Sequence, residues 1–345
     1  MALKARPLRK QSAFLGAAGL VSAAFFAAPS PAVGQDERPE TETQSPLQIF
    51  QHREDLLFRV GYRLAVANAE FCDARVPATG MLVHDAAAYG DPRAVRALFN
   101  LSGDLAVQSV APGSPASRAG LRVNDTLVAI AGKAIAETWQ PTDPAWKRSQ
   151  EIREYLDQQL QLGPVRLTWR DAAGMLREAV LEPVESCASR FELLTSSSKA
   201  SADGDRVLVG EDFPGFGYAE DEFAAMVAHE MAHNLLGHLD YLEETGRKRR
   251  LVRLTERDAD RLMPWLLVNA GYDPKAAIRF MRQWGPRHGG WIFRKRTHDG
   301  WDERIEFIEA EVKKIEAART AGKMGKADWS LGFIGQSLAT RDDGN

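Results

Sequence analysis

The segment from Ala219 to Leu236 restricts the fold of this chain more than any other. It contains no proline or glycine, and its apolar residues recur every three or four positions, which predicts an amphipathic helix. Within it stand His229 and His233, four residues apart, in the sequence His-Glu-Met-Ala-His. Residues four apart share a helix face, so this spacing predicts a zinc site with both histidines as ligands. Glu230 is then the expected general base acting on a water molecule.

A catalytic zinc site needs a third protein ligand. On a continuous helix His238 would point about 140° away from the metal face, and its spacing does not fit the third histidine of HExxHxxGxxH. Glu256 is the favoured ligand because it opens the next helical pattern, with Asp260 one turn later. Asp260 would accept a hydrogen bond from the outer nitrogen of a zinc-bound histidine. An acid pair on an exposed helix is the alternative interpretation.

Three stretches, residues 202–210, 221–238 and 256–274, together resemble peptidase family M forty-eight, the HtpX-like and BepA-like zinc endopeptidases. The last stretch carries the Glu-x-x-Ala-Asp and Ala-Gly-Tyr-Asp-Pro elements of that family. The resemblance implies one Zn²⁺ per chain, held by the three ligands above. It also implies that His298 and Arg304 line the active-site wall, where either side chain could stabilise an oxyanion. Asp299 stands where the family usually has proline, so a buried structural role is the alternative for His298.

Residues 98–185 have a different character, with short alternating apolar runs that predict strands. The sequence PGSPASRAGLRVNDTLVAIAGKAI, residues 112–135, resembles a PDZ domain of the bacterial protease type. A generic small β-barrel insert is the alternative. PDZ domains bind extended peptides or C-termini at a sheet edge. The carboxylate-binding loop is expected at Phe99–Leu105, although this stretch matches the usual loop pattern poorly.

The N-terminus has the pattern of a secretory signal, with four basic residues and no acidic residue in 1–34 and an apolar stretch from Ala13 to Ala28. Cleavage is expected near Gly34/Gln35, which predicts a periplasmic or secreted protein. An uncleaved membrane anchor is the alternative, and membrane contact is expected only in that case. Cys72 and Cys187 flank the β-rich segment, so a disulfide between them is predicted if that segment leaves and re-enters the rest of the fold at neighbouring points.

The charge balance excludes one class of partner. Loss of the signal lowers the net charge from −3 by four to −7, so no nucleic-acid footprint is expected. Neither a Walker loop nor a GxGxxG motif is present, which leaves nucleotide chemistry without support.

The sequence as a whole predicts an α+β protein, in which a mainly helical zincin-type metallopeptidase domain with a small edge sheet is interrupted by an inserted β-rich PDZ domain. The run Arg206–Val209 is expected to be the edge strand along which substrate lies. The expected divisions are a signal peptide (1–34), a linker (35–46), the first part of the peptidase domain (47–90), the PDZ domain (91–185), the main part of the peptidase domain (186–320) and a flexible tail (321–345).

The predicted function is that of a periplasmic or secreted zinc endopeptidase. Its expected substrates are polypeptides, and the family resemblance points to misfolded or unassembled envelope proteins. The PDZ domain would recruit substrate or regulate cleavage, with a peptide or C-terminus as its partner. A PDZ-bearing chaperone or scaffold with a latent metalloprotease site is the alternative.

Overall fold

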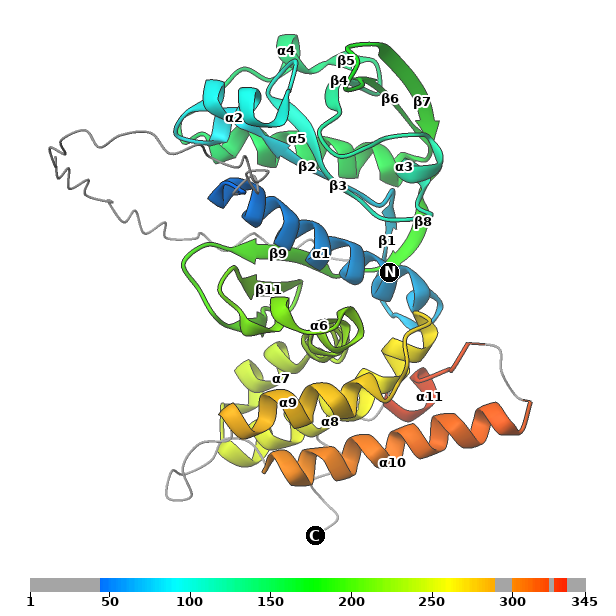
Figure 1. Ribbon diagram of the computed structural model, residues 1–345. Helices are drawn as coiled ribbons and strands as arrows, with labels where there is room; N and C mark the ends of the chain where they lie inside the picture. The colour runs from blue at the N-terminus through cyan, green and yellow to red at the C-terminus, as the bar shows by residue number, and fades with distance from the viewer. Residues whose placement is uncertain (1–43, 289–299, 323–325, 334–345) are drawn as a thin grey trace, which may run out of the picture. The chain divides into compact units, whose positions relative to one another are not determined.

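The computed structural model describes residues 44–288, 300–322 and 326–333 (Figure 1). The predicted signal peptide, most of the predicted linker, His298 and residues 334–345 lie outside the described residues. Helices and strands are mixed along the chain, as the α+β prediction requires. Among the described helices, none is long and apolar enough to cross a membrane.

Helix α1 (Pro46–Ala67) connects the two main parts of the described chain. Ser45 caps it, and Gln48 completes a capping box, so the backbone N–H groups of Ser45 and Gln48 both have partners. Leu57, Val60 and Leu64 recur at three- and four-residue spacing and are buried in the core of the helical part. The helix contacts strand β3 (Leu105–Val110) on one side and β9 (Arg190–Leu194) on the other (Figure 1).

The β-rich module is an antiparallel sheet with the strand order β2-β3-β4-β6-β7, and β5 pairs with β4. Its further strands are β2 (Met81–Asp85), β4 (Thr126–Ile130), β5 (Lys133–Ala134), β6 (Val165–Arg170) and β7 (Leu176–Leu181). Strand β2 lies before residue 91, the predicted start of the PDZ domain, and pairs with β3 along its length. The sheet of the β-rich module therefore begins before that position. The carboxylate-binding loop expected at Phe99–Leu105 stays a prediction.

Four helices belong to this module: α2 (Pro92–Phe99), α3 (Pro115–Arg118), α4 (Ile135–Thr138) and α5 (Trp146–Leu162). Helix α5 packs Ile152, Leu156 and Leu160 against the sheet and so closes a second hydrophobic core. The described chain therefore has two large apolar cores, one in the β-rich module and one in the helical part.

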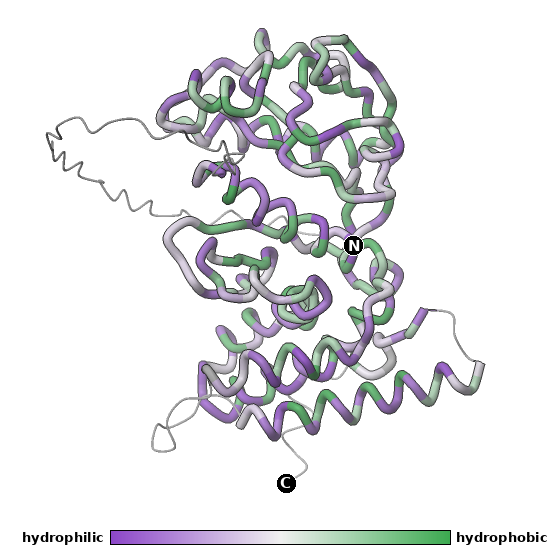
Figure 2. The backbone as a smooth tube through the Cα atoms, viewed as in Figure 1, coloured by the Kyte–Doolittle hydropathy of each residue, from purple (hydrophilic) through white to green (hydrophobic). Residues whose placement is uncertain are grey.

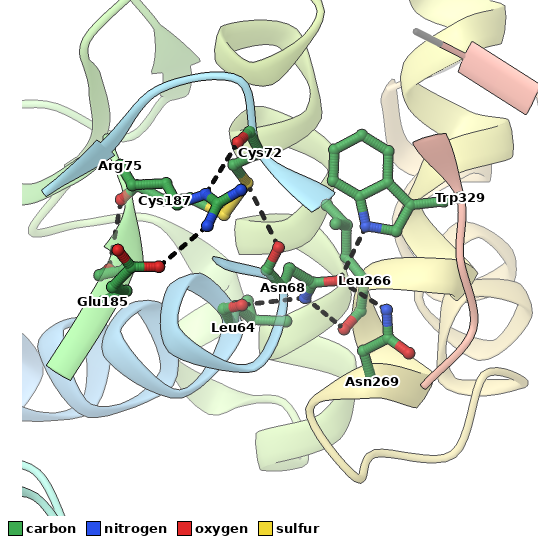
Figure 3. Close-up of a disulfide and its surroundings, with 10 residues drawn as sticks. Leu64, Asn68, Cys72, Arg75, Glu185, Cys187, Leu266, Asn269 and Trp329 are labelled. Carbon is green, nitrogen blue, oxygen red and sulfur yellow. Dashed lines mark hydrogen bonds and ion pairs between the residues drawn. A yellow bond between two sulfur atoms is a disulfide. The ribbon is translucent and has the colours of Figure 1, made fainter. Parts of the chain in front are cut away.

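The chain enters and leaves the β-rich module through two paired strands, β1 (Arg75–Ala78) and β8 (Val184–Cys187). Their antiparallel register places Arg75 opposite Cys187. Cys72 lies three residues before Arg75, and the two cysteines form a disulfide with Cα atoms 5.6 Å apart (Figure 3). The bond joins the two crossings of the chain, as the position of the cysteines on either side of the segment predicts.

A three-stranded sheet follows, with the order β10-β11-β9. Strand β10 (Ala200–Ala202) pairs antiparallel with β11 (Arg206–Gly210), and β11 pairs parallel with β9. The prediction that Arg206–Val209 is the edge strand is therefore wrong. The turn at Gly204, where φ is +99°, folds β10 back along β11, so β11 becomes the central strand and β10 takes one edge.

The helical part contains α6 (Glu220–Leu235), α7 (His238–Thr245), α8 (Arg249–Asn269), α9 (Ala276–His288) and α10 (Trp301–Thr320). Single-turn 3-10 helices occur at Ala69–Phe71, Ala86–Ala88 and Pro214–Gly217. Helix α8 packs against α6 and α10, and α10 also packs against α9. Hydrophilic and hydrophobic residues alternate along α10 (Figure 2). The helix predicted from Ala219 does not continue through His238, because Gly237 adopts a left-handed conformation (φ 63°) and starts a new helix.

Residues 326–333 correct the prediction of a loosely held tail from residue 321. Trp329 is 2% exposed and donates a hydrogen bond from Nε1 to Oδ1 of Asn68, at 2.9 Å (Figure 3). Asn269 binds both the carbonyl and the N–H of Ala327. The short helix α11 (Ser330–Phe333) follows. A buried aromatic ring and three hydrogen bonds therefore hold this segment at the junction of α1 and α8.

Candidate metal centre

Helices α6 and α8 pack together and bring three ligand side chains to one point. His229 and His233 lie on one face of α6, and Glu256 reaches them from α8. One ligand atom from each residue lies within 4.8 Å of the other two. The structure therefore brings together the three residues that the sequence predicts as ligands.

The distances between these atoms fit a small tetrahedral cation. Nε2 of His229 lies 3.3 Å from Nε2 of His233. Each nitrogen lies 3.6 Å from an oxygen of Glu256. Two donor atoms bound at about 2.0–2.1 Å to a tetrahedral zinc ion would lie about 3.3 Å apart. Two imidazoles and one carboxylate are also a usual ligand set for a catalytic zinc site, so the residues fit this metal.

Behind His229 stands a buried carboxylate with its own cation. Nδ1 of His229 lies 3.2 Å from Oδ1 of Asp260, although the two atoms are not aligned for a hydrogen bond. Arg304 of α10 binds both oxygens of Asp260, at 2.6 and 2.7 Å. Asp260 is fully buried, so this bidentate pair compensates its charge.

The groups around the two histidines favour a proton on His229 over one on His233. Burial by itself would lower the pKa of His229, but the carboxylates of Asp260 and Glu256 outweigh it and raise that pKa to about 10. Burial, and then the charge on His229, lower the pKa of His233 to about 4. Burial would raise the pKa of Asp260, yet Arg304 holds it below its ordinary value. A cation entering the site therefore displaces the proton of His229.

A cavity of about 420 Å³ opens above these residues, and Glu230 lines it together with both histidines. Strand β10 forms one rim, and Arg304 contributes to the wall. The large apolar residues that line it are Phe213, Met226, Leu239, Leu242, Val252, Phe280 and Trp284. The cavity thus combines a candidate metal site, a carboxylate beside it and an apolar surface for part of a ligand.

Of the two residues predicted to line the active-site wall, the structure describes Arg304 and not His298. His298 lies outside the described residues. Arg304 lines the cavity, but its Nε and Nη2 atoms bind Asp260, and Nη2 also lies 3.7 Å from Glu256. This geometry supports a role in holding Asp260. Its expected role as a donor to an oxyanion stays a prediction.

Two residues near the centre were not recognised from the sequence. His238, expected to point away from the metal face, has Nδ1 3.0 Å from Nδ1 of His233. The expectation fails because the chain turns at Gly237. Asn234 accepts a hydrogen bond from the N–H of Gly204 at 2.8 Å, which ties the β10–β11 turn to α6. The sequence hints at this contact only by placing a polar residue, Asn234, directly after His233.

Comparison with known proteins bears on the β-rich module. The family model of the PDZ domain matches residues 107–160, from β3 to the last part of α5. None of the curated proteins compared with the chain matches it. The predicted PDZ domain is confirmed for these residues. It indicates a role in protein interaction or substrate recruitment, since PDZ domains commonly bind peptide C-termini.

Proposed function

We propose that this chain is a zinc-dependent endopeptidase similar to those of peptidase family M forty-eight. One observation carries the proposal. The ligand atoms of His229, His233 and Glu256 converge within 4.8 Å at a cavity that Glu230 also lines. Two histidines and a glutamate with a neighbouring second glutamate are what a hydrolytic zinc site requires.

In this proposal His229, His233 and Glu256 hold one zinc ion. The bound ion supplies positive charge that polarises a peptide carbonyl and acidifies a water molecule. Glu230 takes the proton that the attacking water gives up and delivers it to the nitrogen of the leaving amine. Asp260 and Arg304 keep the His229 ring in place through the contacts described above.

The proposed path for substrate runs along β10. This strand lies at one edge of its sheet and at the rim of the cavity. An extended polypeptide would pair with this edge, which carries no other strand among the described residues, and place apolar side chains against Phe213, Met226 and Trp284. Extended segments with exposed apolar residues are typical of unfolded chains. The cavity therefore favours misfolded or unassembled proteins as substrates.

The PDZ domain would recruit such chains or regulate their cleavage. We place the protein in the periplasm or outside the cell. The disulfide between Cys72 and Cys187 supports this proposal, because disulfides persist in oxidising compartments. The secretory pattern of residues 1–34 agrees with it.

The decisive experiment compares the wild-type chain with Glu230→Gln. Zinc content is measured by elemental analysis, and activity is measured by release of fragments from casein. We expect about one zinc per chain in both proteins. Cleavage should be chelator-sensitive in the wild type and lower by a factor of at least about 100 in Glu230→Gln, because the general base is lost.

The control is Glu244→Gln, a matching change at an exposed position of α7 that does not line the cavity. It should retain wild-type activity. Equal cleavage by wild type and Glu230→Gln would refute the mechanism, and a wild-type chain that binds no zinc would refute the site.

The PDZ match also favours a second candidate function, a chaperone or scaffold with a latent protease site. In that case the wild type would bind zinc and suppress the aggregation of an unfolded protein without cutting it. The same preparation used in the casein assay distinguishes the two functions.

A further inference from the structure

The outer nitrogen of His233 faces another histidine. Nδ1 of His238 lies 3.0 Å from Nδ1 of His233, and the two rings meet edge to face with centroids 4.9 Å apart. His238 is 2% exposed, so this contact is shielded from water. A short contact between two ring nitrogens is stable only when one carries a hydrogen and the other does not.

The chain path explains why a residue five positions after His233 reaches it. Helix α6 ends at Leu235, and Gly237 takes the left-handed conformation with φ 63° and ψ 30°. This turn starts α7 at His238 and brings that side chain back beside the preceding helix. No atom lies within 4 Å of the place where a Cβ of residue 237 would stand. Glycine is therefore favoured at this position by the backbone conformation and not by lack of space.

The positions of the nitrogens determine which atom carries hydrogen when a metal is bound. Nε2 of His233 faces Glu256 and Nε2 of His229, so this atom is the one available to a cation. A neutral imidazole that offers Nε2 as a ligand carries its hydrogen on Nδ1. Nδ1–H of His233 would then donate to Nδ1 of His238, which leaves the hydrogen of His238 on Nε2.

Each of the two histidines therefore has its own partner on the outer side. His229 lies against the carboxylate of Asp260, and His233 lies against the neutral ring of His238. Ligand histidines in metal sites usually donate their second N–H in this way, which orients the ring and selects the tautomer. The described residues thus provide a partner behind each ring.

We infer that His238 is a positioning residue for the metal centre: it orients the His233 ring and keeps its hydrogen on Nδ1, so that Nε2 is ready to bind the ion. This inference rests on the proposed function, since it assumes that the site binds zinc. The role falls to a residue that a continuous helix would turn away from the metal face.

The test measures zinc affinity and does not depend on proteolysis. Variants are made in the full chain carrying Glu230→Gln, which prevents self-cleavage, and affinity is measured by competition with a chromogenic chelator. His238→Leu removes the acceptor. In His238→Asn the side chain has nearly the same shape as leucine, but it keeps an oxygen close to the original position of Nδ1. We expect Leu to weaken zinc binding by about 10- to 100-fold and Asn to restore it to within about threefold of the parent.

The control is His84→Leu, a change at another buried histidine. His84 packs edge to face on Tyr89 and Phe99 in the β-rich module and has no hydrogen-bond partner among the described residues. This variant should bind zinc as the parent does. If His238→Leu folds and binds zinc as tightly as the parent, the positioning role is refuted while the metal site stands. If the parent binds no zinc, the proposed function fails and the inference fails with it.

A second measurement needs no variant at position 238. Nitrogen-15 NMR of the zinc-loaded Glu230→Gln chain reports the tautomer of each imidazole. We expect hydrogen on Nδ1 of His233 and on Nε2 of His238. A His238 ring with its hydrogen on Nδ1 would overturn the inference even if the leucine variant failed to fold.

Discussion

At the scale of single residues, the candidate centre depends on side chains that are distant in the sequence. Asp260 could be predicted, because it stands one helical turn after Glu256. Its bidentate pair with Arg304 could not be derived from local spacing, because 44 residues separate the two and helix packing alone decides the contact. A buried carboxylate with one cationic partner is sensitive to loss of that partner.

Replacing this cation should destabilise the whole fold. We expect Arg304→Met to lower the free energy of unfolding by about 3–5 kcal/mol, because the buried Asp260 loses the cation that binds both of its oxygens. The pKa of Asp260 should rise, since burial then acts without Arg304. Urea unfolding followed by circular dichroism measures the change. Arg319→Met, at an exposed position of the same helix, is the control and should leave stability within about 0.5 kcal/mol of wild type.

At the scale of elements, α1 and β3 meet through polar side chains. Gln108 of β3 donates a hydrogen bond to Glu54, and Ser109 donates one to Asp55, at 2.6 Å. Gln51 reaches Asn124 at 2.8 Å. Burial is the main cause that raises the pKa of Glu54 to about 7, against the opposing hydrogen bond from Gln108. This contact between the β-rich module and α1 therefore contains a titrating group.

The stability of the protein should consequently depend on pH through Glu54. Its pKa is about 7 in the folded chain against an ordinary value of 4.5, so the folded state holds an extra proton between these values and loses stability as the pH rises through them. We expect Glu54→Gln to raise the free energy of unfolding by about 1–3 kcal/mol at pH 8 and to change it little at pH 4.

Thermal and urea unfolding at the two pH values measure this difference. The exposed Glu137→Gln change on α4 is the control and should have no comparable effect at either pH. A difference between wild type and Glu54→Gln that is the same at pH 4 and pH 8 would contradict the prediction.

Helix and strand prediction failed mainly where the chain turns. The spacing of apolar residues predicts helix on both sides of Gly237, but it carries no information on the left-handed turn that separates α6 from α7. The same is true of the turn at Gly204, which makes β10 rather than β11 the edge strand. Such errors matter for function, because the two turns decide which residues lie beside the candidate metal ligands.

At the scale of the whole molecule, distant segments are joined near the disulfide. Asn68 is fully buried, and its amide donates hydrogen bonds to the carbonyls of Leu64 and Leu266 (Figure 3). Its oxygen accepts hydrogen bonds from Asn269 and Trp329. One side chain therefore links α1, α8 and the segment after α10.

Removing the aromatic ring at this junction should be costly. We expect Trp329→Ala to lower the free energy of unfolding by about 3–5 kcal/mol, because a large buried side chain is lost and a cavity remains. Trp301→Ala, at a position that is 38% exposed, is the control and should have a smaller effect. Urea unfolding measures the stability of both variants. A loss of stability in Trp329→Ala that is no larger than the loss in Trp301→Ala would contradict the prediction.

Local spacing in the sequence is enough to predict several features of this fold. These are the helix that carries His229 and His233, the helix that carries Glu256 and Asp260, the PDZ-like strands, and the position of the two cysteines on either side of the inserted module. Side chains four residues apart share a helix face whatever the surroundings, so such patterns can be interpreted without a structure.

The contacts between distant groups depend on the folded structure. Folding brings Arg304 to Asp260, turns His238 back to His233, places β10 in the lining of the cavity and buries Trp329 against Asn68. These contacts depend on left-handed glycine turns and on the packing of two apolar cores, which involve residues far apart in the chain. Local spacing contains neither kind of information, and for that reason the surroundings of the candidate metal ligands can be described only in the folded protein.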